Sequence, residues 1–309
     1  MRVKITFPDL TPQDWVARLS KISRSTLLQS YAYAQAIRVS QNLNTRWAVL
    51  LIDGEEAGIA QIHEASILGK LFHVVTLDRG PLWFKGYGKP KDWEDFSKSL
   101  NKLYPKRFGR SRRFIPETDN THLELTDFIK KDLPHYQTIW LDLTAPLEGI
   151  RKNLKQKWRN ALNKAEKQNI TVEIDEYGQF ISWMIKRYID DRIEKKYPGP
   201  SPKFLATLLS FCAKEETLLI FKASIKGEEI AGITVLMHGT SATYQIGWAN
   251  DEGRKNNAMN LLLWQAITTL KSKGITEFDL GGINDQAPGL VKFKEGLNGK
   301  KISYIGHFS

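Results

Sequence analysis

The sequence predicts a mixed α/β protein made of two similar domains, and three observations support this prediction. The chain has 309 residues, more than one compact hydrophobic core usually takes. A strand, a Gly-Glu-Glu turn and a second strand rich in small residues occur at residues 47–60 and again at residues 219–235. Each copy is typical of a β-hairpin. Their separation is too long for a solenoid repeat and suits a duplicated domain.

Helices and strands are expected to alternate around the second hairpin. Residues 203–214 and 260–273 predict helices, and residues 275–280 predict a strand that follows the second helix. This α/β (α+β) order around a central hairpin resembles an acetyltransferase-like (GNAT) lobe.

The domain boundary is expected near Leu141. Residues 138–143 predict a strand, and a long amphipathic helix follows from about Pro146, since proline is favoured where a helix begins. We therefore expect an N-terminal domain at residues 1–140 and a C-terminal domain at residues 141–309.

The composition indicates a globular protein that has no internal disulfide and no membrane-spanning segment. Hydrophobic residues make up 41% of the chain and charged residues 26%, which is typical of a globular protein. Cys212 is the single cysteine, so no internal disulfide can form. The first residues lack an apolar run of signal-peptide length, and the longest such run, residues 47–52, is far shorter than the roughly 20 residues that span a bilayer. These features predict a cytoplasmic protein.

The charge balance favours an anionic partner. Lysine and arginine number 45 against 34 acidic residues, a formal charge of +11. Such an excess attracts phosphate-rich partners through long-range forces and counterion release. Solubility is the alternative explanation.

The most informative stretch lies near the C-terminus. Residues 274–283 predict a strand that ends at Gly281 and Gly282, where the lack of side chains permits close backbone approach. A short helix follows and carries Phe293 and Lys294, with Lys294 expected at the rim of a cleft.

This Asp-Leu-Gly-Gly turn before a Phe-Lys pair resembles the C-terminal signature of the Fem family (FemABX) of aminoacyl-tRNA-dependent peptidoglycan bridge transferases. Residues 29–38, the run Arg79-Gly-Pro-Leu, Asp142-Leu143 and the basic segment 154–166 resemble other family landmarks, in family order. The resemblance implies two tandem GNAT-like domains. It also implies that the long helical arm of some members is missing here, because the connection at residues 167–183 is too short for one.

The resemblance also implies an activity. The protein is expected to move an amino acid from aminoacyl-tRNA to an amine of a peptidoglycan precursor peptide, nucleotide-linked or lipid-linked, and so to build interpeptide bridges of the cell wall. An aminoacyl ester is already activated, so the site must mainly position two reactants and stabilise developing negative charge. Lys294 is the implied catalytic ammonium, with Phe293 beside it. Gly281 and Gly282 are expected to contact substrate.

For other residues near this signature, two roles are considered. Asp279 either orients the glycine turn or holds an amine, although an aspartate at a strand end often caps local amides. Tyr244 and Trp248 are expected on one face of a strand at i and i+4, where they line the acceptor channel or fill a core.

The N-terminal domain carries the implied acceptor contacts. Tyr33 and Arg38 lie where the family places an aromatic residue and a basic group for the acceptor's diphosphate, with Arg38 offset by about one residue. Arg110 and Arg113 belong to a second basic cluster on a predicted strand. Ile115 stands where the family often has an acid, so one acceptor contact is expected to differ.

A basic amphipathic helix is expected over residues 147–168, with apolar residues spaced three and four apart. Like charges at i and i+4, such as Arg151 and Lys155, cost stability unless a polyanion offsets them. The resemblance implies transfer RNA as that polyanion. Anionic lipid headgroups, through peripheral contact at the inner membrane surface, and a plain solvated face are the alternatives. The candidate tRNA-binding residues are Arg151, Lys152, Lys155, Lys157 and Arg159.

No cofactor is expected. Residues 245–257 lack the glycine spacing of a CoA pyrophosphate loop and place Asp251 and Glu252 where the anion would lie. The six histidines show no metal-ligand spacing, so no metal is expected either. Two alternatives remain open: an N-acyltransferase that uses a thioester donor on another sugar or peptide amine, and a non-catalytic binder of RNA or anionic surfaces.

Overall fold

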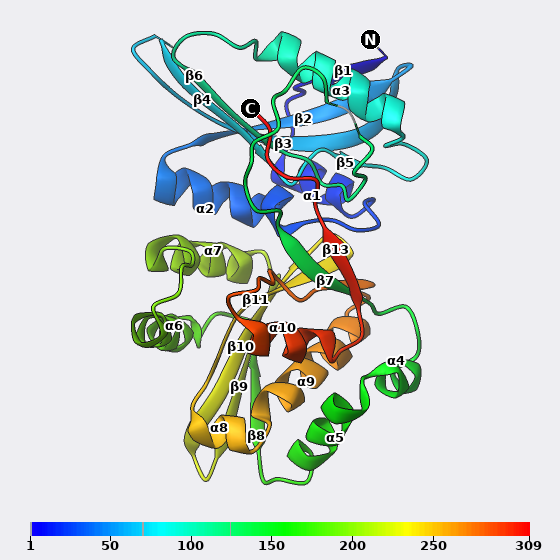
Figure 1. The fold of residues 1–309 in the computed structure, drawn as a ribbon. Coiled ribbons are helices and arrows are strands. Elements are labelled where there is room, and N and C mark those ends of the chain that lie inside the picture. Colours follow the sequence, from blue (N-terminus) through cyan, green and yellow to red (C-terminus); the bar gives the residue numbers. More distant parts are fainter. Residues whose placement is uncertain (1, 70, 124) are drawn as a thin grey trace. The chain divides into compact units, whose positions relative to one another are not determined.

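The computed structural model describes residues 2–69, 71–123 and 125–309 (Figure 1). The chain divides into two compact units, Met1–Gln137 with Ile302–Ser309, and Thr138–Lys301. The C-terminal residues therefore belong with the first unit, although the sequence pattern assigned them to the second. Phe308 exchanges backbone hydrogen bonds with Phe114, N–H to O at 2.8 and 2.9 Å.

The first unit is built on a six-stranded sheet in the order β1-β2-β3-β4-β6, with β5 paired to β3. All described pairs are antiparallel except β4 and β6. Its strands are β1 (Val3–Thr6), β2 (Asn44–Ile52), β3 (Glu55–Ile67), β4 (Phe72–Asp78), β5 (Leu82–Trp83) and β6 (Arg110–Ile115). Its helices are α1 (Pro12–Leu19), the 3-10 turn η1 (Leu27–Gln29), α2 (Tyr31–Gln41) and α3 (Pro90–Leu103).

Apolar residues cover both faces of this sheet. On one face, Phe96 and Trp93 of α3 pack with Phe114 in the larger core, and on the other Trp15 of α1 packs with Ile59. Successive side chains along β2 and β3 point to opposite faces of the sheet, so these two strands contribute apolar residues to both cores.

The second unit has a seven-stranded sheet in the order β13-β7-β12-β11-β10-β9-β8. Its strands are β7 (Gln137–Asp142), β8 (Thr171–Asp175), β9 (Leu218–Ile225), β10 (Glu228–His238), β11 (Ser241–Ala249), β12 (Glu277–Asp279) and β13 (Lys300–Ser303). Its helices are α4 (Leu147–Asn153), α5 (Gln156–Ala165), α6 (Ile181–Lys195), α7 (Pro202–Lys214), α8 (Asp251–Lys255), α9 (Ala258–Ser272) and α10 (Pro288–Glu295).

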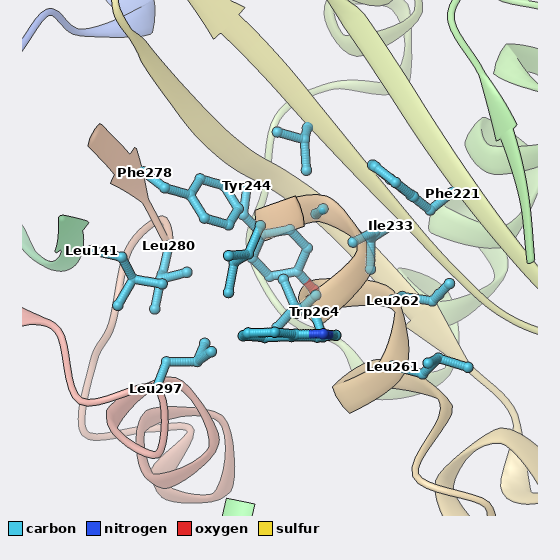
Figure 2. Packing of buried hydrophobic residues seen from close by; sticks show 14 of the residues in the cluster. Leu141, Phe221, Ile233, Tyr244, Leu261, Leu262, Trp264, Phe278, Leu280 and Leu297 are labelled. Carbon is cyan, nitrogen blue, oxygen red and sulfur yellow. The ribbon is translucent and has the colours of Figure 1, made fainter. Parts of the chain in front are cut away.

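Helices cover both faces of the second sheet. Helix α9 contacts β9, β10 and β11 on one face and also contacts α5, whereas α6 and α7 pack against the sheet on the other. The large core lies between α9 and the sheet, and Figure 2 shows its packing around Tyr244, Phe278 and Trp264.

The two units repeat one strand pattern, which confirms both predicted hairpins and the mixed α/β order. In the first unit, β2, β3 and β4 form an antiparallel meander and β6 adds in parallel after helix α3. In the second unit, β9, β10 and β11 form the same meander and β12 adds in parallel after α8 and α9. Among the described residues no helix is longer than 15 residues, so this part of the chain contains no coiled-coil arm.

The predicted long basic helix is two helices, so that prediction was wrong. Helix α4 ends before Leu154, and both Leu154 and Lys155 have extended backbone angles. Leu154 is buried at this break, and the N–H of Lys155 donates to the carbonyl of Gly296 (2.9 Å). Arg151 and Lys155 are therefore not one helical turn apart, and the repulsion expected between them does not apply.

Helices in the described part of the chain are too short or too polar to cross a membrane.

Candidate active site

Lys294 lies in the last turn of α10 with only 4% of its surface exposed. Its Nζ donates to the carbonyls of Gly282 (2.8 Å) and Gly281 (3.2 Å). The side chain forms part of the wall of a cleft of about 630 Å³, which we call the Lys294 cleft. Lys294 was expected at the rim of a cleft, and it does line a cleft, although its side chain is buried.

The environment of Lys294 is unusual for an ammonium. Burial lowers the pKa of Lys294 to about 8, and the nearby carboxylate of Asp279 opposes that shift. The face of the Tyr244 ring lies 5.6 Å from Nζ. Since an ammonium has three N–H donors and two point at the glycine carbonyls, one remains for a substrate oxygen.

The glycine turn is held by Asp279. Its buried Oδ1 accepts a hydrogen bond from the N–H of Gly281 (2.8 Å) and one from the hydroxyl of Thr138. Gly281 has φ +73°, and a Cβ there would lie 2.8 Å from the carbonyl oxygen of Tyr244. Asp279 therefore orients the turn that presents two carbonyls to Lys294, which is one of the two roles considered for it.

Substitution of Gly281 by alanine is expected to destabilise the protein by about 1–2 kcal/mol, because the left-handed backbone and the contact with Tyr244 both disfavour a side chain. The turn should shift and misplace the acceptors of Lys294. We expect the midpoint of urea unfolding to fall and transfer activity to fall with it. Gly227→Ala is a suitable control, because Gly227 has φ +83° but nothing within 4 Å of its added Cβ. Equal activity in the two variants would contradict this role.

Helix α10 is anchored to α5 at its end. A Cβ on Gly296 would lie 2.5 Å from the Trp158 ring, so the two helices approach closely there. The rings of Trp158 and Phe293 stack obliquely with centroids 6.1 Å apart. Phe293 therefore fixes the helix that carries Lys294.

Tyr244 and Trp248 lie on opposite faces of the sheet, so the prediction of a shared face was wrong. Val235 of β10 pairs with Tyr244 and Thr234 with Ile246, which leaves Gln245 as an extra residue in a β-bulge. A bulge reverses the alternation beyond it. Tyr244 consequently packs in the core beside α9, whereas the Trp248 ring packs edge-on against Trp183 of α6, with centroids 6.1 Å apart.

Sequence reasoning missed the opposite wall of the Lys294 cleft. Asp191 and Lys195 of α6 and Tyr197 after it line this wall. Asp191 is buried, accepts from the hydroxyl of Tyr197 (3.1 Å) and forms an ion pair with Lys195. A polar pair at i and i+4 in a half-buried helix was the available signal. Such pairs are common on solvated helices, so it did not stand out.

Two further hollows are lined in part by residues of α10. The Trp248 hollow, about 450 Å³, shares Tyr244 and Leu290 with the Lys294 cleft. The Lys155 hollow, about 540 Å³, shares Asn260 and Phe293 with the Trp248 hollow. The three hollows thus form a series around α10, in which each neighbouring pair shares lining residues.

The basic residues of α4 and α5 fall into two groups. Lys155 and Lys157 line the Lys155 hollow together with Lys292 of α10. Arg151 instead forms an ion pair with Glu166 (Nη1 to Oε1 2.7 Å). Arg159 donates to the carbonyl of the exposed Lys152 (2.8 Å).

The first unit contains a separate cluster of polar residues around Tyr33. Arg113 donates to Asp78 (Nε to Oδ1 2.8 Å), and the rings of Tyr33 and His63 lie 6.3 Å apart. Burial, reinforced by Asp78, raises the pKa of Tyr33. Burial also lowers the pKa of His63 to about 4. His63 Nδ1 lies 2.9 Å from the hydroxyl of Thr45.

This cluster predicts that the first unit loses stability in acid. The unfolded chain protonates His63 near its ordinary pKa of 6.5, whereas the folded chain protonates it near 4. The stability it contributes is therefore complete above pH 6.5 and lost as the pH falls from 6.5 to 4. At about 1.4 kcal/mol per pKa unit this amounts to about 3 kcal/mol at most. Urea unfolding of His63→Gln should show a shallower loss over that pH range, and an unchanged slope would contradict the assignment.

Arg38 and Arg110 lie outside the Tyr33 cluster. Arg38 follows Tyr33 by five helical residues, a rotation of about 140° around α2, and is exposed. Residues 110 and 113 have opposite parity on β6 and point to opposite faces. Arg110 donates to His73 Nδ1 (3.2 Å) and to the carbonyl of Pro105 (2.8 Å). The structure thus separates the arginines that were expected to act together.

The described residues include no group of three or more His, Cys, Asp or Glu side chains placed to hold a metal ion. Helix α8 lies in the segment 245–257 that was compared with a CoA pyrophosphate loop. It has five residues and carries Asp251 and Glu252 in its first turn, which disfavours an anion there.

Comparisons with known proteins define the class of fold. Residues 149–295 match the family model described as Acetyltransferase (GNAT) domain. No curated protein sequence matches the chain. The match spans the residues that line the Lys294 cleft and supports the prediction of an acyltransferase.

The whole chain is similar in structure to FemX, with a TM-score of 0.81 at 13% sequence identity, over 99% of this chain and 96% of that chain. A conserved protein of unknown function from Bacteroides thetaiotaomicron matches with a TM-score of 0.63 at 14% identity, over 99% and 98% of the two chains. A tandem GNAT protein from the clavulanic acid biosynthesis pathway gives a TM-score of 0.51 at 10% identity, over 99% and 98%. The chain thus has the FemX-like tandem GNAT fold, which confirms the resemblance to the Fem family at the level of fold.

Proposed function

We propose that this protein is an aminoacyltransferase that moves an amino acid from aminoacyl-tRNA to an amine of a peptidoglycan precursor peptide. The observation that carries the proposal is the buried ammonium of Lys294 at one end of a series of hollows whose other end is lined by Lys155 and Lys157. The FemX-like fold supports it.

The proposed reaction requires a hydrogen-bond and proton donor, and the Lys294 ammonium can act as both. The acceptor amine forms an N–C bond with the ester carbonyl carbon, the carbonyl oxygen becomes negative, and the C–O bond to the ribose then breaks. The amine nitrogen loses a proton and the departing ribose oxygen gains one. An ammonium with a pKa of about 8 can stabilise the oxyanion and can also supply the proton to the ribose oxygen. A fixed donor of this kind lowers such an activation barrier by about 3–4 kcal/mol.

The donor strand is proposed to pass around α10 through these hollows. A tRNA ends in a single strand, whose phosphates suit the lysines of the Lys155 hollow and whose bases can stack on aromatic rings. Phe293 and Trp248 line the Trp248 hollow. The terminal ribose ester would then enter the Lys294 cleft, where Asp191 offers a buried carboxylate for an ammonium of either reactant.

The acceptor is proposed to use the first unit. The half-buried Tyr33 and the exposed Arg113 are the proposed donors there, and Arg113 Nε also donates to Asp78. Arg38, being exposed on another side of α2, is left out of this proposed contact.

The acceptor half of the proposal can be tested by mass spectrometry. We expect nucleotide-linked and lipid-linked muropeptide precursors, incubated with the protein and a mixture of all charged tRNAs, to gain the mass of one amino acid residue. Prior acetylation of the acceptor's side-chain amine should abolish the gain. Absence of any gain across all charged tRNAs and both precursor forms would reject the proposal.

A second candidate is an N-acyltransferase that uses a thioester donor, because the matched domain is an acetyltransferase domain. The acidic first turn of α8 speaks against it, since it repels a pyrophosphate. We expect no heat of binding when acetyl-CoA is titrated into the protein. Saturable binding would favour this candidate over aminoacyl transfer.

A further inference from the structure

The first unit exposes a group of large apolar side chains where β3 turns into β4. Ile67, Leu68, Leu71 and Phe72 are all exposed, and Leu68 shows 71% of its surface. Phe108, in the loop before β6, is the most exposed of the large apolar residues described, at 85%. We call these five residues the β3–β4 tip. Clusters of this kind on a soluble domain mark interaction sites.

The tip is a single preformed surface. Arg107 Nη1 donates to the carbonyls of Leu71 (3.2 Å) and Phe108 (3.0 Å) and so joins the two loops. The N–H of His73 donates to the carbonyl of Gly109 (2.8 Å). A Cβ on Gly109 would lie 2.2 Å from the Leu71 carbonyl oxygen, so this close approach requires glycine.

The two segments of sequence that form the tip carry basic residues and no acidic ones. The sequence holds no acidic residue between Glu64 and Asp78, nor between Asp95 and Glu117. Glu64 is itself occupied by His73 and Arg46. The second interval contains seven basic residues. Lys98 and Arg113 form ion pairs with Glu94 and Asp78, and the others are Lys102, Lys106, Arg107, Arg110 and Arg112.

Two of these charges repel each other beside the tip. Partial burial and the neighbouring charge of Arg107 lower the pKa of Arg110. An anion placed between the two guanidinium groups would relieve that repulsion. Neither Arg107 nor Arg110 belongs to the Tyr33 cluster, so the proposed reaction assigns no role to these two arginines.

We propose that the β3–β4 tip docks on the surface of an anionic lipid bilayer, with the apolar side chains inserted at the boundary of headgroups and acyl chains and the basic residues on lipid phosphates. Exposed apolar residues ringed by lysine and arginine are the features that bind such surfaces. The inference does not depend on the proposed reaction.

Two other partners fit less well. Ile67, Leu68 and Leu71 are aliphatic, so a nucleic acid base could stack only on Phe72 and Phe108 and would leave most of the apolar surface uncovered. A second copy of the chain would bring the same positive rim against itself, which disfavours self-association.

The test is co-sedimentation of the full chain with phosphatidylcholine vesicles, with or without phosphatidylglycerol. We expect binding only to vesicles that contain phosphatidylglycerol, and weaker binding as salt rises. The double variant Leu68→Asn with Phe108→Ser should bind at least tenfold more weakly; asparagine tolerates the left-handed backbone at residue 68 (φ +51°). The matched control is Ile193→Ser, which removes an equally exposed apolar residue (70%) from the other unit and should bind as the wild type does.

Each remaining outcome overturns the inference. Equal vesicle binding by the double variant and the wild type would remove the tip from any membrane contact, as would no binding by the wild type. Loss of tRNA binding in the double variant with vesicle binding intact would assign the tip to nucleic acid. A change of oligomeric state without a change in vesicle binding would assign it to self-association. Sedimentation requires no aminoacyl transfer, so failure here is distinct from failure of the proposed reaction, and thermal melting of both variants checks that they are folded.

Discussion

Substitution of Lys294 by methionine is expected to lower the rate of aminoacyl transfer by about 10²–10³-fold, the usual effect of removing one donor that stabilises an oxyanion. Methionine has a similar length and suits a buried site. The lost activity should therefore come without loss of structure. Single-turnover assays with saturating charged tRNA measure this rate directly.

The same variant should be as stable as the wild type or more stable. Burial lowers the pKa of Lys294 to about 8 from an ordinary 10.5, so the folded protein holds this proton less tightly than the unfolded chain does. The stability of the wild type should therefore rise with pH between about 8 and 10.5. At about 1.4 kcal/mol per pKa unit the rise is about 3 kcal/mol at most. The Lys294→Met variant should lack this rise in stability.

Urea unfolding of both proteins at several pH values between 7 and 11 supplies the measurement. A variant that keeps full transfer activity would exclude Lys294 from catalysis. A variant that loses activity together with cooperative unfolding would show that the lysine is structural.

Charge reversal in the Lys155 hollow is expected to weaken tRNA binding by about 100-fold at low salt. Lys155→Glu with Lys157→Glu removes two cations from the surface proposed to meet the donor strand and adds two anions. The plot of log affinity against log salt should become shallower by about 1.5, because two phosphate contacts are lost. Filter binding across a salt series measures both quantities.

The matched control is Lys164→Glu with Lys167→Glu, which changes the overall charge equally. Both lysines are exposed and neither belongs to the lining of the Lys155 hollow. This control should lose much less affinity. Equal losses in the two double variants would mean that net charge, rather than the hollow, determines binding.

The sequence predicted the parts of the fold that depend on local pattern. The two hairpins follow from apolar runs around Gly-Glu-Glu turns, and α7, α9 and β12 follow from helical and strand periodicity. The Asp-Leu-Gly-Gly turn and the following helix were also placed correctly, because glycine and proline mark such boundaries locally.

Features set by tertiary contacts could not be read in advance. The helix break at Leu154 arises because that leucine is buried and Lys155 bonds to Gly296, which is distant in sequence. The bulge at Gln245 has no local signature, yet it sends Tyr244 and Trp248 to opposite faces. The wall formed by Asp191 is likewise a product of packing between α6 and the sheet.

The separation of Arg110 from Arg113 was within reach of the sequence. Residues of opposite parity on a strand point to opposite faces, and applying that rule to β6 would have divided the arginine cluster. The burial of Lys294 could not be predicted from the sequence. It depends on the close contact between the end of α10 and α5 at Gly296, and the spacing of residues in the sequence does not reveal that contact.

The most direct test of the central claim is a competition between donors in a single turnover. The protein is mixed with a muropeptide acceptor, tRNA charged with amino acids that carry one isotope, and acetyl-CoA that carries another. We predict that only the amino acid label reaches the acceptor, that ribonuclease treatment of the tRNA abolishes this transfer, and that Lys294→Met slows it. Acetyl label on the acceptor, with no amino acid label at any enzyme concentration, would contradict the account.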